Sequence, residues 1–249
     1  MLAHDEKLTE VVRRLQEAAG DNLFSVVLYG SAARGEYQPQ RSDLNLLCLL
    51  KSAKAHELAR LSGVIRWWSG QLQEPVPHFF TPEELKSSAD VFAIELLDIG
   101  RSHRVLFGPD PIADLEVPTN LHRVQVEHEL RSVQQKLREQ LVRGGEDESH
   151  LRNTYSRSIS GVAVLLRHVL IAFGEDPPAD RASVFLRVAE LTGADASAFE
   201  TGTALRDGHS IPEISRAYGK YLDALATVVH ALDSLVPKRE WQRVRKQNF

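Results

Sequence analysis

One stretch near the N-terminus contains residues whose types and spacing suit phosphate binding. Gly30 and Ser31 follow an apolar run, Leu23–Tyr29, that has the length and β-branched content of a buried strand. A Gly-Ser turn after a strand brings backbone N–H groups and a hydroxyl close to a phosphate, and the N-terminus of a following helix favours its negative charge. We therefore expect a short helix at 32–36 and a phosphate site at the turn, with Arg34 one turn further on as an additional cation.

A second apolar run, Leu44–Leu50, follows a polar loop and is entered through Ser42 and Asp43. Because side chains alternate along a strand, positions 43 and 45 are expected to face the same side. Magnesium prefers hard anionic oxygen ligands in near-octahedral geometry, so two carboxylates would suit this position. The sequence supplies one carboxylate, Asp43, and one neutral amide, Asn45, which can coordinate a cation but cannot offset its charge.

This order of strand, Gly-Ser turn, short helix and acidic strand resembles the nucleotidyltransferase (polymerase-β-like) superfamily. The residues that match its pattern are Gly30, Ser31, Arg34, Gly35, Ser42 and Asp43. A domain of this kind followed by a helical bundle also resembles the aminoglycoside nucleotidyltransferases. The resemblance implies a nucleoside triphosphate with Mg²⁺ as cofactor, and in-line displacement at the α-phosphorus assisted by two metal ions.

The resemblance also implies carboxylates that this sequence lacks. The second aspartate of the superfamily falls on Asn45, and the third carboxylate falls on a later strand, here within residues 74–80, where His78 is the position most suited to face the site. Histidine is a poor magnesium ligand. Glu36 and Glu74 are nearby carboxylates that would have to substitute, but we expect both on the solvated surface because glutamate is seldom buried.

Three functions remain open on these residues. The first is a nucleotide-binding, regulatory or partner-binding module whose degenerate site, Asp43, Asn45 and His78, is weakly active or inactive. The second is an active nucleotidyltransferase that moves an NMP from Mg·NTP to a hydroxyl of a small molecule or a protein. The third is a structural interaction module without nucleotide, in which Ser31 caps a helix, Asp43 closes a turn and His78 is a partly buried strand residue.

Hydrophobic periodicity predicts two domains. Residues 1–118 alternate helix and strand patterns, which indicates a mixed sheet with helices. Residues 119–249 contain only helical patterns and predict an antiparallel bundle. The bundle ends in a basic tail, 238–249, that includes Trp241. This tail suits contact with a nucleic acid or an acidic partner, but we expect a solvated chain end whose deletion leaves stability nearly unchanged.

Composition narrows the partners and the compartment. Residues 1–118 hold 17 acidic and 12 basic side chains, a net charge of −5, and residues 119–249 hold 17 and 18, a net charge of +1. Neither half has the basic excess of a nucleic-acid-binding surface, and the bundle has no acidic excess to attract a polycationic acceptor. No apolar run approaches the ~20 residues that span a bilayer. With a polar N-terminal segment and one cysteine, Cys48, expected in the core, the sequence predicts a cytoplasmic protein without disulfides.

Overall fold

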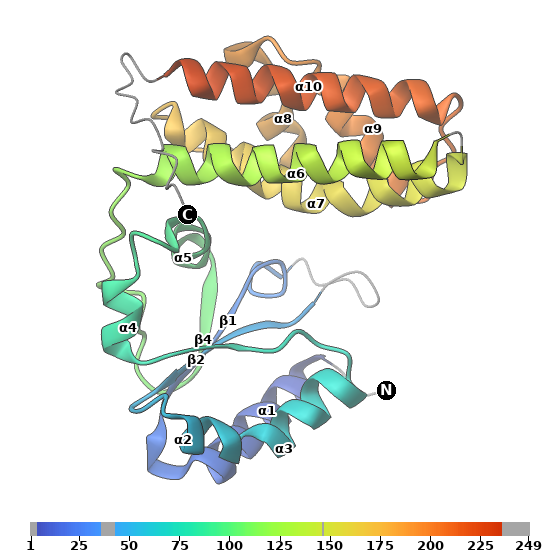
Figure 1. The fold of residues 1–249 in the computed structure, drawn as a ribbon. Coiled ribbons are helices and arrows are strands. Elements are labelled where there is room, and N and C mark those ends of the chain that lie inside the picture. The colour runs from blue at the N-terminus through green and yellow to red at the C-terminus, as the bar shows by residue number, and fades with distance from the viewer. Residues whose placement is uncertain (1–3, 36–42, 146, 236–249) are drawn as a thin grey trace, which may run out of the picture. The chain divides into compact units, whose positions relative to one another are not determined.

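The computed structural model describes residues 4–35, 43–145 and 147–235, and the chain divides into two compact units, Met1–Leu121 and His122–Phe249. All strands of the described residues lie in the first unit, and the described part of the second unit is helical (Figure 1). The predicted fold class, a mixed sheet with helices followed by an all-helical bundle, is confirmed. No helix within the described ranges is both long and apolar enough to cross a membrane.

The sheet of the first unit has the strand order β3-β2-β1-β4. Its strands are β1 (Leu23–Tyr29), β2 (Asn45–Leu50), β3 (His78–Phe80) and β4 (His103–Phe107). Both β2 and β4 run antiparallel to β1, whereas β3 runs parallel to β2. The short β3 therefore occupies an edge, as expected for a segment that contains prolines.

Both faces of the sheet are covered, which explains why its two central strands are apolar almost throughout. On one face Val26, Leu46 and Cys48 pack with α1 (His4–Ala19) and α3 (Ser62–Ile65). On the other face Val27 and Leu47 pack with α4 (Pro82–Ser87) and α5 (Ala93–Arg101). Figure 1 shows α1 and α3 on one side of the sheet and α4 and α5 on the other. Burial raises the pKa of the Cys48 thiol to about 12, which agrees with the core role expected for it.

The remaining helical segments of the first unit are short. They are the 3₁₀ turn η1 (Gly20–Asn22), α2 (Ala55–Arg60) and the π-helical η2 (Arg66–Gln71). The short helix expected at 32–36 does not form within the described residues. Instead the Gly30 carbonyl accepts hydrogen bonds from the amides of Ala33 and Arg34, and the turn ends at Gly35, which has φ 75°. So few residues cannot offset the cost of starting a helix.

The second unit consists of five helices within the described residues. They are α6 (His122–Gly144), α7 (Glu148–Ala172), α8 (Arg181–Thr192), α9 (Ala196–Arg206) and α10 (Ile214–Ser234). Helices α6 and α10 run antiparallel, as two hydrogen bonds show. The Arg123 guanidinium near the start of α6 donates to the carbonyl oxygen of Leu232 near the end of α10 at 3.3 Å. The Tyr218 hydroxyl near the start of α10 donates to the carbonyl oxygen of Leu137 in α6 at 2.8 Å. The basic tail, 238–249, lies outside the described residues.

Two histidines are buried together in the second unit. The Nε2 atom of His122 on α6 lies 2.9 Å from Nδ1 of His168 on α7, and neither side chain is accessible to solvent. Burial, aided by the neighbouring His168, lowers the pKa of His122 from its ordinary value of 6.5 to about 4. The folded unit therefore holds His122 in its neutral form at neutral pH.

This burial predicts an acid-sensitive second unit. Between pH 6.5 and 4 the unfolded chain binds a proton at His122 that the folded chain does not, so stability falls as the pH falls through this window. The full loss is about 3 kcal/mol for one group with such a shift. Calorimetric melting across the window measures it. His122→Asn should remove part of the pH dependence, whereas His128→Gln, a change at an exposed position of α6, should leave it intact.

Candidate functional site

The turn after β1 fits closely against the start of β2. Gly30 has φ 80°, a conformation that costs other residues steric strain. A Cβ atom added to Gly30 would come within 3.2 Å of the side-chain amide nitrogen of Asn45. Tyr29 and Asn45 are register partners at the end of the β1–β2 ladder. The predicted phosphate turn and the predicted metal strand therefore lie side by side at Gly30 and Asn45.

The hydrogen bonds that close the turn do not use all of its backbone N–H groups. The bonds that close it use the N–H groups of Ala33, Arg34 and Gly35. The amides of Ser31 and Ala32 take no part in these bonds. Ser31 is half-buried and the Arg34 side chain is exposed. A turn with backbone amides, a hydroxyl and a cation is of the kind that can accept an anionic oxygen.

Three residues of the candidate site share one face of the sheet. Because register partners project to the same side, Tyr29 lies on the same face as Asn45, and His78 lies on the same face as Leu47, two residues further along β2. The rings of Tyr29 and His78 are 6.4 Å apart between centroids. His78 is exposed, not partly buried as an ordinary strand histidine would be. Asp43 is also exposed and precedes the first residue of β2 by two positions.

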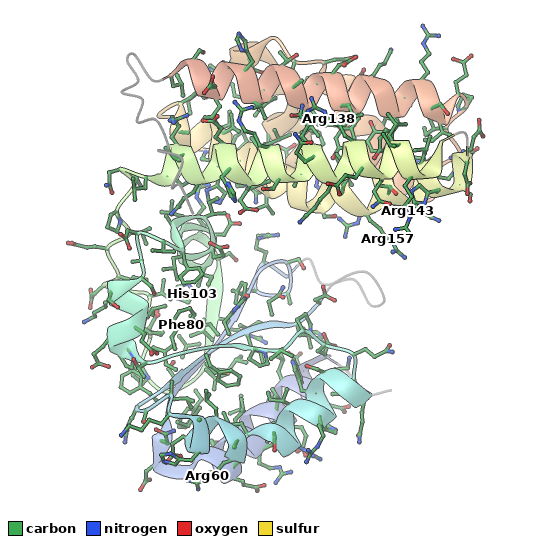
Figure 2. The ribbon with its side chains drawn as sticks, in the orientation of Figure 1. Arg60, Phe80, His103, Arg138, Arg143 and Arg157 are labelled. Atoms are coloured by element: carbon green, nitrogen blue, oxygen red, sulfur yellow. The ribbon has the colours of Figure 1, made fainter. Side chains whose placement is uncertain are left out.

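The same face is covered by α5, which contributes a carboxylate that the sequence analysis missed. Burial raises the pKa of Tyr29 to about 12, and the negative charge of Glu95 on α5 adds to this effect. Glu95 is itself exposed. Figure 2 shows Phe80 and His103 between the sheet and α5, where His103 Nδ1 lies 2.9 Å from the carbonyl oxygen of Ile99. No local sequence pattern connects Glu95 with the Gly30–Asn45 stretch, because the packing of α5 alone brings it near.

The expectation that Glu74 lies on the solvated surface is wrong. Its side chain is only 6% exposed. One carboxylate oxygen lies 2.6 Å from Nζ of Lys7, and the other accepts the backbone N–H of Leu44 at 2.9 Å. Each oxygen of Glu74 therefore already has one hydrogen-bonding partner within the protein. Glu36 and Ser42 lie outside the described residues.

These donors do not fit a two-magnesium site. Across residues 4–35, 43–145 and 147–235, no group of three or more histidine, cysteine, aspartate or glutamate side chains could hold a metal ion. Asp43 and Asn45 together offer one carboxylate and one amide oxygen. Such a pair suits a single magnesium ion that arrives already bound to phosphate oxygens, because Mg²⁺ is commonly held by one or two protein carboxylates plus substrate phosphates.

Comparison with known proteins finds two similarities, one in sequence and one in fold. Residues 6–100 match the model of the nucleotidyltransferase domain, a range that runs from α1 to α5. No curated protein matches the sequence. Among solved structures, spectinomycin adenyltransferase AAD(9) from Enterococcus faecialis, crystallised with ATP and spectinomycin, is similar with a TM-score of 0.55 and 15% identity. The match covers 88% of this chain and 98% of that one, and at this identity it establishes the fold alone. Residues 6–100 therefore resemble a nucleotidyltransferase domain, and the fold of the chain is similar to that of a solved adenyltransferase, including its helical C-terminal part.

Proposed function

We propose that this protein binds a nucleoside triphosphate at the Gly30–Ser31 turn and transfers its nucleotide slowly or not at all. The observation that carries the proposal is the position of the Asn45 side chain close to Gly30, where it would crowd any added Cβ. It puts a neutral amide beside the phosphate turn, where the resemblance to the superfamily implies a carboxylate. Glu74 is already engaged in this proposal, because one of its oxygens pairs with Lys7 and the other accepts the Leu44 amide.

The residues of the turn have distinct roles in this proposal. The backbone N–H groups of Ser31 and Ala32 bind phosphate oxygens, the Ser31 hydroxyl adds a hydrogen bond, and Arg34 supplies positive charge. Asp43 and Asn45 present oxygen atoms to the magnesium ion of the nucleotide. When bound, that ion neutralises phosphate charge. Exposed His78 faces the same side of the sheet but adds no anionic oxygen.

The incomplete donor set predicts that magnesium binding depends on nucleotide. We expect Mg²⁺ alone to bind weakly, because one carboxylate and one amide do not complete its coordination. With a panel of nucleoside triphosphates, isothermal titration calorimetry should detect binding that magnesium strengthens. Micromolar affinity for Mg²⁺ without nucleotide would contradict the incomplete site. An absence of binding to every triphosphate would instead favour a structural interaction module.

A second candidate function is active transfer of a nucleotide to a hydroxyl of a small molecule or a protein. Two observations favour it: the similarity extends over 98% of the spectinomycin adenyltransferase chain, and Glu95 lies close enough to Tyr29 to influence its pKa. In this alternative a helix, not the β3 edge strand, supplies the missing carboxylate. Rapid pyrophosphate release that Glu95→Gln abolishes would establish this function over the first.

The turn residues predict graded losses of nucleotide affinity. Arg34→Ala should weaken binding by ~1–3 kcal/mol, the value of a charged hydrogen bond, and Ser31→Ala should weaken it less. Arg60→Ala is a matched control, because Arg60 lies on α2, apart from the turn, and pairs with Glu57 (Figure 2). Titration of the three variants with the tightest triphosphate measures these losses. Unchanged affinity in both turn variants would remove the phosphate turn from the proposal.

Restoring carboxylates should recover function in two steps. Asn45→Asp rebuilds an acidic pair and should tighten magnesium-nucleotide binding with little effect on rate. Adding His78→Asp or His78→Glu supplies a third carboxylate on the same face, and the rate of nucleotide consumption should then rise by at least tenfold, about 1.4 kcal/mol of activation free energy. Pyrophosphate release is the measurement. Asn153→Asp, which adds the same charge at an exposed position of α7, is the control. Brisk turnover by the wild type would contradict the degenerate site.

A further inference from the structure

A buried ion pair joins three segments beside the candidate site. Lys7 of α1 and Glu74, four residues before β3, are 11% and 6% exposed at their side chains, and their charged atoms are 2.6 Å apart. The second oxygen of Glu74 accepts the N–H of Leu44 at 2.9 Å in a fully buried environment. We call Lys7, Glu74 and Leu44 the clamp. A surface ion pair would leave this amide to water, whereas here the carboxylate alone satisfies it.

The main chain on either side of Glu74 is fixed, so the carboxylate is presented rigidly. The amide of Glu74 donates to the carbonyl of Trp68 at 3.2 Å, and the indole N–H of Trp68 donates to the carbonyl of Pro75 at 2.8 Å. Trp68 is completely buried. Gln73, just before Glu74, adopts φ 59°, which is unfavourable for a residue other than glycine. A strained residue next to a fully bonded one indicates that this position is tightly determined.

The amide held by the clamp lies between the two candidate metal residues. Leu44 separates Asp43 from Asn45, and its side chain is fully buried in the cluster on the α1 face. Side chains alternate along an extended chain, so fixing Leu44 toward α1 directs its two neighbours toward the opposite side. That is the side of Tyr29 and His78. The β2 ladder starts only at Asn45, so the clamp extends backbone order to Leu44.

We propose that Glu74 is a positioning residue that orients Asp43 and Asn45 toward magnesium-bound nucleotide. The inference rests on the proposed function, since it concerns the same site. Glu74 acts through the Leu44 amide and touches no ligand itself. Groups that orient metal ligands in this way commonly change metal affinity or activity when they are removed, although they are not ligands.

Two double variants separate positioning from filling of the core. Lys7→Met/Glu74→Gln removes both charges but keeps an oxygen that can accept the Leu44 amide. Lys7→Met/Glu74→Met also removes both charges and fills a similar volume, but has no such oxygen. We expect Lys7→Met/Glu74→Met to lose about tenfold or more in the affinity for Mg·ATP, a typical effect of removing an outer-shell partner. ATP binding without magnesium, which uses the phosphate turn, should stay unchanged, and Lys7→Met/Glu74→Gln should behave as the wild type in both measurements.

Hydrogen exchange at the Leu44 amide provides a readout that does not require nucleotide. It should be faster in Lys7→Met/Glu74→Met than in the wild type and Lys7→Met/Glu74→Gln. Equal Mg·ATP affinity in both double variants, or equal Leu44 exchange, would overturn the positioning role. If Lys7→Met/Glu74→Met does not fold, Glu74→Asp replaces it, because the shorter side chain keeps the charge but withdraws from Leu44. A wild type that binds no nucleotide would refute the proposed function and with it the orientation toward nucleotide, whereas failure of the inference alone leaves wild-type binding intact.

Discussion

The antiparallel pairing of β1 with β2 is the constraint on which the rest of the first unit depends. Its register puts Tyr29 opposite Asn45 and so brings the glycine turn against the start of the second strand. Both strands are buried on both faces of the sheet. A shift of one residue in the register would turn the side chains that pack against α1 and α3 toward α4 and α5, and the reverse. The hydrophobic core thus fixes the position of the turn relative to the start of β2.

Much of this arrangement could be predicted from the sequence because it is encoded locally. The apolar runs, the Gly-Ser turn and the helical second half follow from residue patterns a few positions long. The capped start of α4, in which Thr81 and Glu84 bond each other's backbone, is equally local. Such features need no knowledge of which distant segments meet.

The errors concern residues whose environment depends on distant segments. Glutamate is usually exposed, yet Glu74 is buried because Lys7, 67 positions away, and the Leu44 amide both lie against it. Glu95 could not be found from spacing, because only the packing of α5 over the sheet brings its charge near Tyr29. The prediction of a helix at 32–36 was wrong, because five residues without tertiary support rarely form a stable helix. The turn that replaces it still leaves two amides outside its own hydrogen bonds.

The location of the single cysteine has a practical consequence. Cys48 lies at the centre of β2, fully buried against the α1 layer, and its raised pKa keeps the thiol protonated at neutral pH. The thiolate is the reactive form, so Cys48 of the native protein should not react with alkylating reagents. A cysteine introduced at any exposed position can therefore carry a fluorophore or spin label without competing modification. Conversely, labelling of Cys48 itself signals that the sheet has opened, which makes the wild-type chain its own reporter of unfolding in the first unit.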